Sequence, residues 1–126
     1  MNLKNRCTVL FTGVILLSIA WQSNANNLVD KTTIKKVQKI YGTQASQDVA
    51  AWNDLLQELE GQDIQQQLSR VNNFFNRQKF VDDIEHWNKE DYWATPIEFI
   101  ASGGGDCEDF SIAKYFSMRA LGVPAI

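Results

Sequence analysis

The sequence predicts a secreted, mainly helical domain, and three observations support this prediction. Apolar residues recur at helical spacing through much of the chain after residue 26. Polar N-cap residues precede these segments and glycines follow them, as at natural helix boundaries. The first 25 residues have the composition of a cleavable secretory signal peptide.

The N-terminal segment fits a signal peptide in each of its parts. Lys4 and Arg6 supply a positive start, residues 8–20 are apolar, and Ser23-Asn24-Ala25 places small residues where a signal peptidase reads them. An uncleaved membrane anchor is the alternative, but this apolar run is shorter than the roughly 20 residues that span a bilayer. We therefore assign residues 1–25 to the signal peptide, with cleavage after Ala25.

Length and charge limit what the remaining residues 26–126 can be. The chain of 126 residues suffices for one small domain, and its formal net charge is −3. Loss of Lys4 and Arg6 with the signal peptide makes the mature chain more acidic. Because binding to phosphates needs a basic face, a nucleic-acid partner is not expected. Nothing in the charge pattern indicates binding to a lipid surface.

Three helices are predicted before residue 80. Asp30 caps the first, which runs to Ile40 and ends at Gly42; Ser46 begins the second, which ends before Gly61; Asp63 begins the third. Residues at helical spacing in the second and third form apolar stripes that we expect in the core. These stripes are Val49, Trp52, Leu55, Leu56 and Leu59, followed by Ile64, Leu68, Val71 and Phe75.

The signals sharpen after an irregular, acidic and aromatic stretch at residues 80–93. Thr95, Pro96 and Glu98 have the spacing of a capping box with proline at the first helical position, which predicts a short helix to about Ala101. Glycines at 103–105 end this helix. We expect them to adopt positive φ and to let a substrate approach the backbone closely.

Asp106 then caps a helix to Leu121, followed by Gly122 in the left-handed conformation and by Pro124. Its apolar positions, which we expect to be buried, are Phe110, Ala113, Phe116, Ala120 and Leu121. Residues 123–126 are expected to begin a strand. Because the sequence stops inside this apolar run, we expect it to be the N-terminal part of a longer protein.

Cys107 is the candidate nucleophile. Cys7 departs with the signal peptide, so the mature chain has no internal disulfide and no cysteine-based zinc site. In the first turn of a helix, unpaired N–H groups and the helix dipole favour the thiolate, and the same amides can help to hold an oxyanion. The alternative is that Cys107 is a small buried hydrophobic residue beside an ordinary glycine loop.

Three carboxylates, Asp106, Glu108 and Asp109, flank this cysteine and oppose formation of a thiolate unless something neutralises them. A hard cation such as calcium would do so. Alternatively, Asp106 only caps the helix and the other two are solvated. His86 is the only histidine. Because nothing in its spacing brings it to Cys107, we expect it on the surface and expect the catalytic base beyond Ile126.

The segments WATPIEF at residues 93–99, GGGDCEDFSIAKY at 103–115 and LGVP at 121–124 resemble the bacterial transglutaminase-like cysteine proteinases, of which the LapG-type periplasmic proteases are members. The resemblance implies an α+β, papain/transglutaminase-like cysteine protease fold. This chain would hold mainly the N-terminal helices and the central nucleophile helix, with most of the sheet missing.

The resemblance also implies site residues, a cofactor and partners. Cys107 matches the nucleophile of a Cys-His-Asp triad, and Asp106 and Glu108 match positions used for Ca²⁺. The histidine and aspartate of the triad have no counterparts, so this chain alone is expected to be inactive. LapG-type proteases are periplasmic; they cut the N-terminal region of a large surface adhesin, which releases biofilm, and a cyclic di-GMP-responsive inner-membrane receptor can sequester them.

Two other functions remain open from the sequence. The same fold can transfer an acyl group to an amine instead of to water, and the acceptor site is not visible in these residues. A non-catalytic secreted binding domain of the same fold is the second alternative. A downstream histidine followed by an acidic residue would favour the protease over this binding domain.

Overall fold

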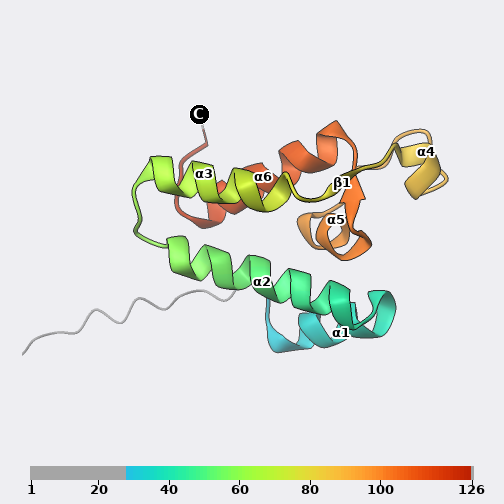
Figure 1. The fold of residues 1–126 in the computed structure, drawn as a ribbon, viewed down its shortest axis with the longest axis horizontal. Coiled ribbons are helices and arrows are strands. Elements are labelled where there is room, and N and C mark those ends of the chain that lie inside the picture. Colours follow the sequence, from blue (N-terminus) through green and yellow to red (C-terminus); the bar gives the residue numbers. More distant parts are fainter. Residues whose placement is uncertain (1–27, 126) are drawn as a thin grey trace, which may run out of the picture.

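The computed structural model describes residues 28–125, so the predicted signal peptide, Cys7 and Ile126 lie outside the described residues. The described part contains six helices and two two-residue strands (Figure 1). In chain order these are α1 (Lys31–Tyr41), α2 (Thr43–Leu59), α3 (Ile64–Phe75), β1 (Lys79–Phe80), α4 (Asp83–His86), α5 (Pro96–Ser102), β2 (Gly104–Gly105) and α6 (Cys107–Ala120). Within residues 28–125 no helix combines the length and apolarity needed to cross a membrane.

The first helix has the predicted boundaries, whereas the second starts earlier than predicted. Asp30 caps α1 by accepting a hydrogen bond from the amide of Thr33 at 2.6 Å, and Gly42 ends it with a φ of 96°. α2 begins at Thr43 and not at Ser46. The hydroxyl of Ser46 donates to the carbonyl of Thr43 at 2.7 Å. Ser46 therefore lies inside the helix as a buried residue and does not cap it.

Asp63 caps α3 as predicted, but the predicted apolar stripe of this helix is only half right. Val71 and Phe75 are buried, whereas Ile64 and Leu68 are exposed. The buried position one turn before Val71 belongs to Gln67, whose amide Nε2 donates to the carbonyl of Leu59 at the end of α2, at 3.1 Å. This hydrogen bond satisfies a helix-end carbonyl that would otherwise lack a partner. The core-facing side of α3 is thereby rotated away from Ile64 and Leu68.

The core forms where α2 meets α3, α5 and α6. α2 runs between α1 on one side and the pair formed by α3 and α6 on the other (Figure 1). Phe75 packs edge-on against Trp52, with ring centroids 6.5 Å apart, and stacks on Phe99 at 5.9 Å. The indole Nε1 of Trp52 donates to the hydroxyl of Ser117 at 2.9 Å, which fixes α6 against α2. Position 117 is fully buried, whereas the predicted core residue Phe116 is exposed.

The stretch at residues 80–93, predicted to be irregular, overlaps the end of β1 and contains the short helix α4. β1 pairs in parallel with β2, Lys79 opposite Gly104 and Phe80 opposite Gly105. The short helix α4 follows, and the rest of the stretch is irregular as predicted. The sequence pattern did not reveal either element, because a strand of two residues and a helix of four residues are too short to show a periodicity.

The end of α6 explains why residues 123–125 form no strand. Gly122 has the predicted positive φ of 87°. The amide of Val123 donates back to the carbonyl of Met118 at 3.1 Å, and its carbonyl accepts from Arg119 Nη1 at 2.6 Å. These bonds close a Schellman-type helix end. Because both backbone groups of Val123 are used there, the expectation of a strand is wrong for residues 123–125.

Candidate active site

Cys107 is the first residue of α6 and its side chain is exposed. The helix starts with a reciprocal capping box: Asp106 accepts from the amide of Asp109, and Asp109 accepts from the amide of Asp106 at 3.3 Å. The thiol therefore lies at the positive end of a helix of 14 residues. This is the predicted position, and the alternative of a buried, structural cysteine does not agree with it.

The glycine loop before Cys107 works differently from the prediction. Only Gly103 has a positive φ, 84°, where it ends α5. A Cβ atom at Gly104 would collide with the backbone carbonyl of Lys79, and one at Gly105 would collide with the carboxylate of Asp109. The close approach that these two glycines permit is thus made by the protein's own β1 and by Asp109, and not by a substrate.

Asp109 is fully buried, with 0 % of its surface exposed, and connects two segments. Its Oδ1 accepts from the amide of Ala94 at 2.7 Å, while its Oδ2 accepts from the amide of Asp106. Burial raises the pKa of the Asp109 carboxyl and the charges of Asp106 and Asp83 act in the same direction, although the two backbone hydrogen bonds oppose them. Asp109 therefore holds the loop before α5 against the start of α6.

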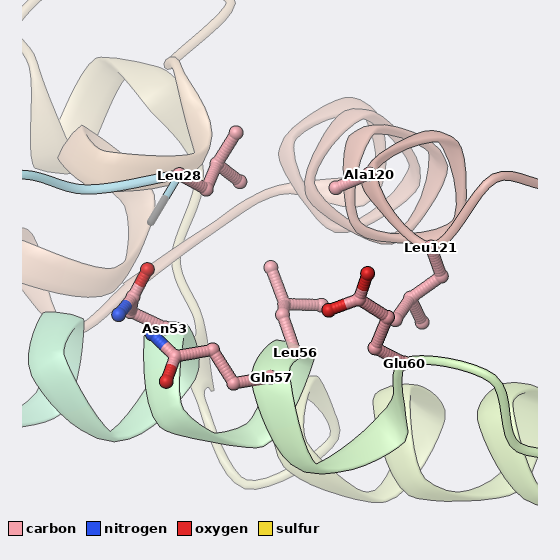
Figure 2. Close-up of a pocket in the computed structure, with 7 residues that line it drawn as sticks. All are labelled: Leu28, Asn53, Leu56, Gln57, Glu60, Ala120 and Leu121. Atoms are coloured by element: carbon pink, nitrogen blue, oxygen red, sulfur yellow. The ribbon is translucent and has the colours of Figure 1, made fainter. Parts of the chain in front are cut away.

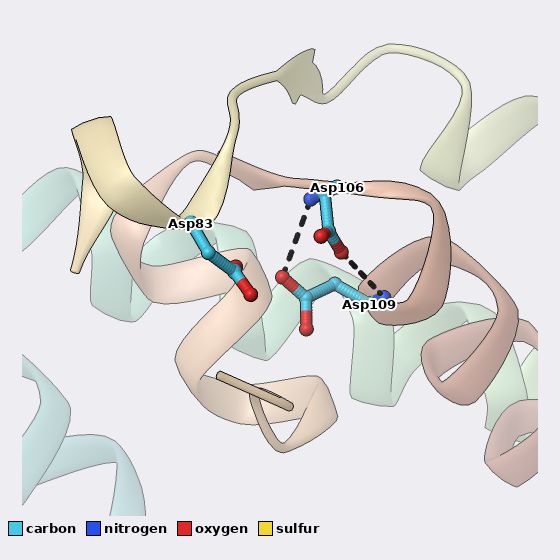
Figure 3. A group of neighbouring side chains, drawn as sticks. All are labelled: Asp83, Asp106 and Asp109. Carbon is cyan, nitrogen blue, oxygen red and sulfur yellow. Dashed lines mark hydrogen bonds between the residues drawn. The ribbon is translucent and has the colours of Figure 1, made fainter. Parts of the chain in front are cut away.

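Asp83, Asp106 and Asp109 each bring one carboxylate oxygen into a group in which all three oxygens lie within 4.8 Å of one another (Figure 3). Asp83 is 4 % exposed; its Oδ2 accepts from the amide of Tyr92 at 2.5 Å, while its buried Oδ1 has no hydrogen-bond partner among the described residues. Converging carboxylates with one unsatisfied buried oxygen suit a hard cation such as calcium.

Of the two residues predicted to bind calcium, this group includes Asp106 but not Glu108, which is exposed. Sequence reasoning missed Asp83. It lies 26 positions before Asp109 in an acidic stretch, and no spacing rule links it to the cysteine segment. The only sequence signal for a metal ligand there was the adjacent pair Asp82-Asp83, in a stretch to which no other role was assigned.

The sulfur of Cys107 opens onto a shallow groove lined by Trp93, Cys107, Glu108, Ser111 and Ile112. His86 does not line it. That histidine ends α4, where its ring meets the edge of Trp87 at 4.7 Å. It is half-buried, with its Nε2 enclosed and unpartnered among the described residues, so it is less exposed than the surface position that we expected. No residue lining the groove can act as an imidazole base.

A second pocket, of about 210 Å³, lies between α2 and the C-terminal end of α6 (Figure 2). Its lining comprises Leu28, Asn53, Leu56, Gln57, Glu60, Ala120 and Leu121. The length of α6 places it roughly 20 Å from Cys107, at 1.5 Å per helical residue. Because it contains neither a nucleophile nor paired titratable groups, the candidate active site is the groove at the N-terminal end of α6.

Residues 39–126 match the model of the family described as bacterial transglutaminase-like cysteine proteinase. The chain belongs to this family. Calcium-bound LapG of Legionella pneumophila is 40 % identical to it, with a TM-score of 0.59, over 72 % of this chain and 52 % of LapG. EGTA-treated LapG of the same organism gives 40 % identity and a TM-score of 0.59, over 72 % and 50 % of the two chains.

This bacterial cysteine proteinase chain thus spans about half the length of the LapG structures that it matches. The predicted fold is confirmed: the chain is mostly helical with little sheet, and it corresponds to part of the transglutaminase-like fold of LapG. Among curated proteins, none matches the chain.

Proposed function

We propose that the protein is a periplasmic, calcium-dependent cysteine endopeptidase in which Cys107 is the nucleophile. The observation that carries this proposal is the exposed sulfur at the N-terminus of α6, open to a groove, in a chain of a cysteine proteinase family. A buried thiol or one in mid-helix would have neither access to a substrate nor the field of the helix terminus.

The chemistry is transfer of an acyl group to sulfur and then to water. The thiolate attacks the carbonyl carbon of a peptide bond, the C–N bond breaks, and the amine leaves with a proton from the general acid. Water then cleaves the thioester and restores the thiol. Backbone amides in the first turn of α6 are candidates for holding the oxyanion. The family resemblance implies a histidine and an aspartate as the partners of Cys107, and no histidine lines the groove among the described residues.

Asp83, Asp106 and Asp109 would hold the calcium ion. The converging oxygens and the unsatisfied Oδ1 of Asp83 support this assignment, as does the calcium-bound state of the similar LapG. When bound, the cation supplies positive charge that offsets much of the negative charge of these three carboxylates near the start of α6. Glu108, the other ligand implied by family resemblance, is exposed and lies outside this group.

The substrate and partners follow from the family resemblance alone. We propose that the substrate is the N-terminal region of a large surface adhesin and that its cleavage releases biofilm. An inner-membrane receptor responsive to cyclic di-GMP would sequester the protease. The signal peptide predicted at residues 1–25 supports a periplasmic location.

The test uses protein expressed from the complete gene and the purified N-terminal region of the adhesin from the same bacterium. We expect cleavage by the native protein and none by Cys107→Ala, while iodoacetamide at neutral pH should alkylate Cys107 and abolish cleavage. Mass spectrometry of the Cys107 peptide measures the alkylation. Cleavage that persists in Cys107→Ala would refute the assignment of the nucleophile.

A further inference from the structure

Trp93 is an exposed tryptophan beside the nucleophile. It is 66 % exposed, whereas Trp52 is buried in the core. An indole in water forgoes the large stabilisation that burial of an aromatic ring provides. Among the described residues, neither capping nor core packing accounts for this side chain, because the capping residue of α5 is Thr95 and the buried neighbour is Ala94.

The backbone on both sides of Trp93 is fixed by buried carboxylates. The amide of Tyr92 donates to Asp83 Oδ2 at 2.5 Å, and the amide of Ala94 donates to Asp109 Oδ1 at 2.7 Å. Charge-assisted hydrogen bonds of this kind are among the stronger ones in proteins. The indole is therefore presented from a fixed position, and a ring with two side-chain torsions loses little entropy when a ligand packs on it.

Trp93 and Ile112 line the groove of Cys107 and also a second, largely apolar groove that adjoins it. The other residues that line the second groove are mostly apolar and include Trp52, Ile97 and Phe116. The two grooves meet at the indole. A peptide whose scissile carbonyl lies at the sulfur has the side chain of an adjacent residue within reach of this apolar wall.

We propose that Trp93 is a specificity-determining residue: its indole, with Ile112, binds an apolar side chain next to the scissile bond of a peptide substrate. This inference rests on the proposed protease function, because it takes Cys107 as the nucleophile. Peptides with an apolar residue at that position are preferred, since a charged or strongly polar side chain would lose its hydration against Trp93 and Ile112 without gaining a hydrogen bond or an ion pair.

The first experiment needs no proteolysis and uses protein from the complete gene. Rates of alkylation of Cys107 are measured by mass spectrometry with N-benzylmaleimide and N-ethylmaleimide, each divided by its rate with free N-acetylcysteine. We expect the native protein to favour the benzyl reagent at least threefold, because its ring packs on the indole. Trp93→Ala should lose this preference and Trp93→Phe should keep at least half of it.

Tyr115→Ala is the matched control, since Tyr115 is a 51 % exposed aromatic residue on α6 that lines neither groove. It should keep the native preference. Circular dichroism checks that each variant is folded. An unchanged preference in folded Trp93→Ala would overturn the inference, as would an equal loss in Tyr115→Ala.

The second experiment compares peptides that differ only in one residue beside the cleaved bond, apolar or polar. Trp93→Ala should narrow the discrimination between them at least fivefold, mainly through KM, whereas a purely structural residue would lower kcat for both alike. A reactive Cys107 with no proteolysis of any peptide would refute the proposed function and, with it, the assignment of Trp93 to substrate specificity. Proteolysis with no such discrimination would refute the role of Trp93 and leave the protease proposal intact.

Discussion

The hydrogen bond between Trp52 and Ser117 makes a quantitative prediction about how α6 is held. Both side chains are buried, and the hydroxyl of Ser117 accepts from the indole N–H at 2.9 Å while it donates to the carbonyl of Ala113 at 2.8 Å. Ser117→Ala would leave the indole N–H without an acceptor in the core. Stranding a buried donor costs about 1–3 kcal/mol. We expect a loss of that size in the free energy of unfolding.

Ser111→Ala is a matched control on the same helix. The hydroxyl of Ser111 makes the same type of bond, to the carbonyl of Cys107 at 2.8 Å, but this residue is exposed and no side chain donates to it. Its replacement should change the free energy of unfolding by less than about 0.5 kcal/mol. Urea denaturation followed by circular dichroism measures both variants.

A double-mutant cycle with Trp52→Phe isolates the hydrogen bond from other effects of the substitution. Once the indole N–H is absent, Ser117→Ala should cost at least 1 kcal/mol less than it does in the native background, because no donor is stranded. Equal losses for Ser117→Ala in both backgrounds, or equal losses at positions 111 and 117, would refute the reasoning.

Two further predictions concern carboxylates near the site. Burial raises the pKa of Glu98, but hydrogen bonds from Thr95 and Tyr92 outweigh this effect and lower the pKa below 4.5. The charge of Glu98 therefore stabilises the folded state above pH 4.5. This contribution disappears as the pH falls through the lowered pKa. Glu98→Gln should therefore cost about 1 kcal/mol of unfolding free energy near neutral pH and progressively less as the pH falls below 4.5, as measured by urea denaturation. A difference that stays constant with pH would contradict this. Asp83→Asn should weaken calcium binding at least tenfold in calorimetric titrations, whereas Asp82→Asn, which alters an exposed carboxylate that makes no capping bond, should not. Equal weakening by both would indicate a general charge effect and refute the assigned ligand.

Helix boundaries were predictable wherever a side chain performs a local task. Asp30, Asp63, Thr95 and Asp106 each accept a hydrogen bond from a backbone amide two or three residues later, so sequence spacing alone reveals the cap. Ser46 has the same cap chemistry but lies inside α2, because Thr43 begins the helix one turn earlier and its carbonyl takes the hydroxyl. A polar residue near a helix start thus indicates the helix more reliably than it indicates the first residue.

The orientation of the helices in the core was less predictable, because it depends on partners far along the chain. Gln67 is buried since its amide satisfies the carbonyl of Leu59, and Ser117 is buried since its hydroxyl satisfies Trp52. In each case a polar residue occupies a position that periodicity assigns to an apolar one. Meanwhile Leu68 and Phe116, which fit the apolar pattern, remain exposed. Hydrophobic spacing cannot identify such exchanges because the hydrogen bond that compensates them is not local.

The candidate site shows the same limit. The positions of Cys107 and Asp106 were predictable because a helix start is a local feature, but the hydrogen bonds that hold this helix start in place are not all local. Asp83 accepts from the amide of residue 92, and Asp106 accepts from that of residue 109. Asp109 accepts from the amides of residues 94 and 106. These bonds join three separate segments. Asp106 and Asp109, which flank Cys107 and oppose a thiolate electrostatically, are therefore also groups that position the nucleophile. Asp83 and Asp109 fix the backbone on both sides of Trp93. The mutual repulsion of the three carboxylates opposes this arrangement, and a bound cation would weaken that repulsion.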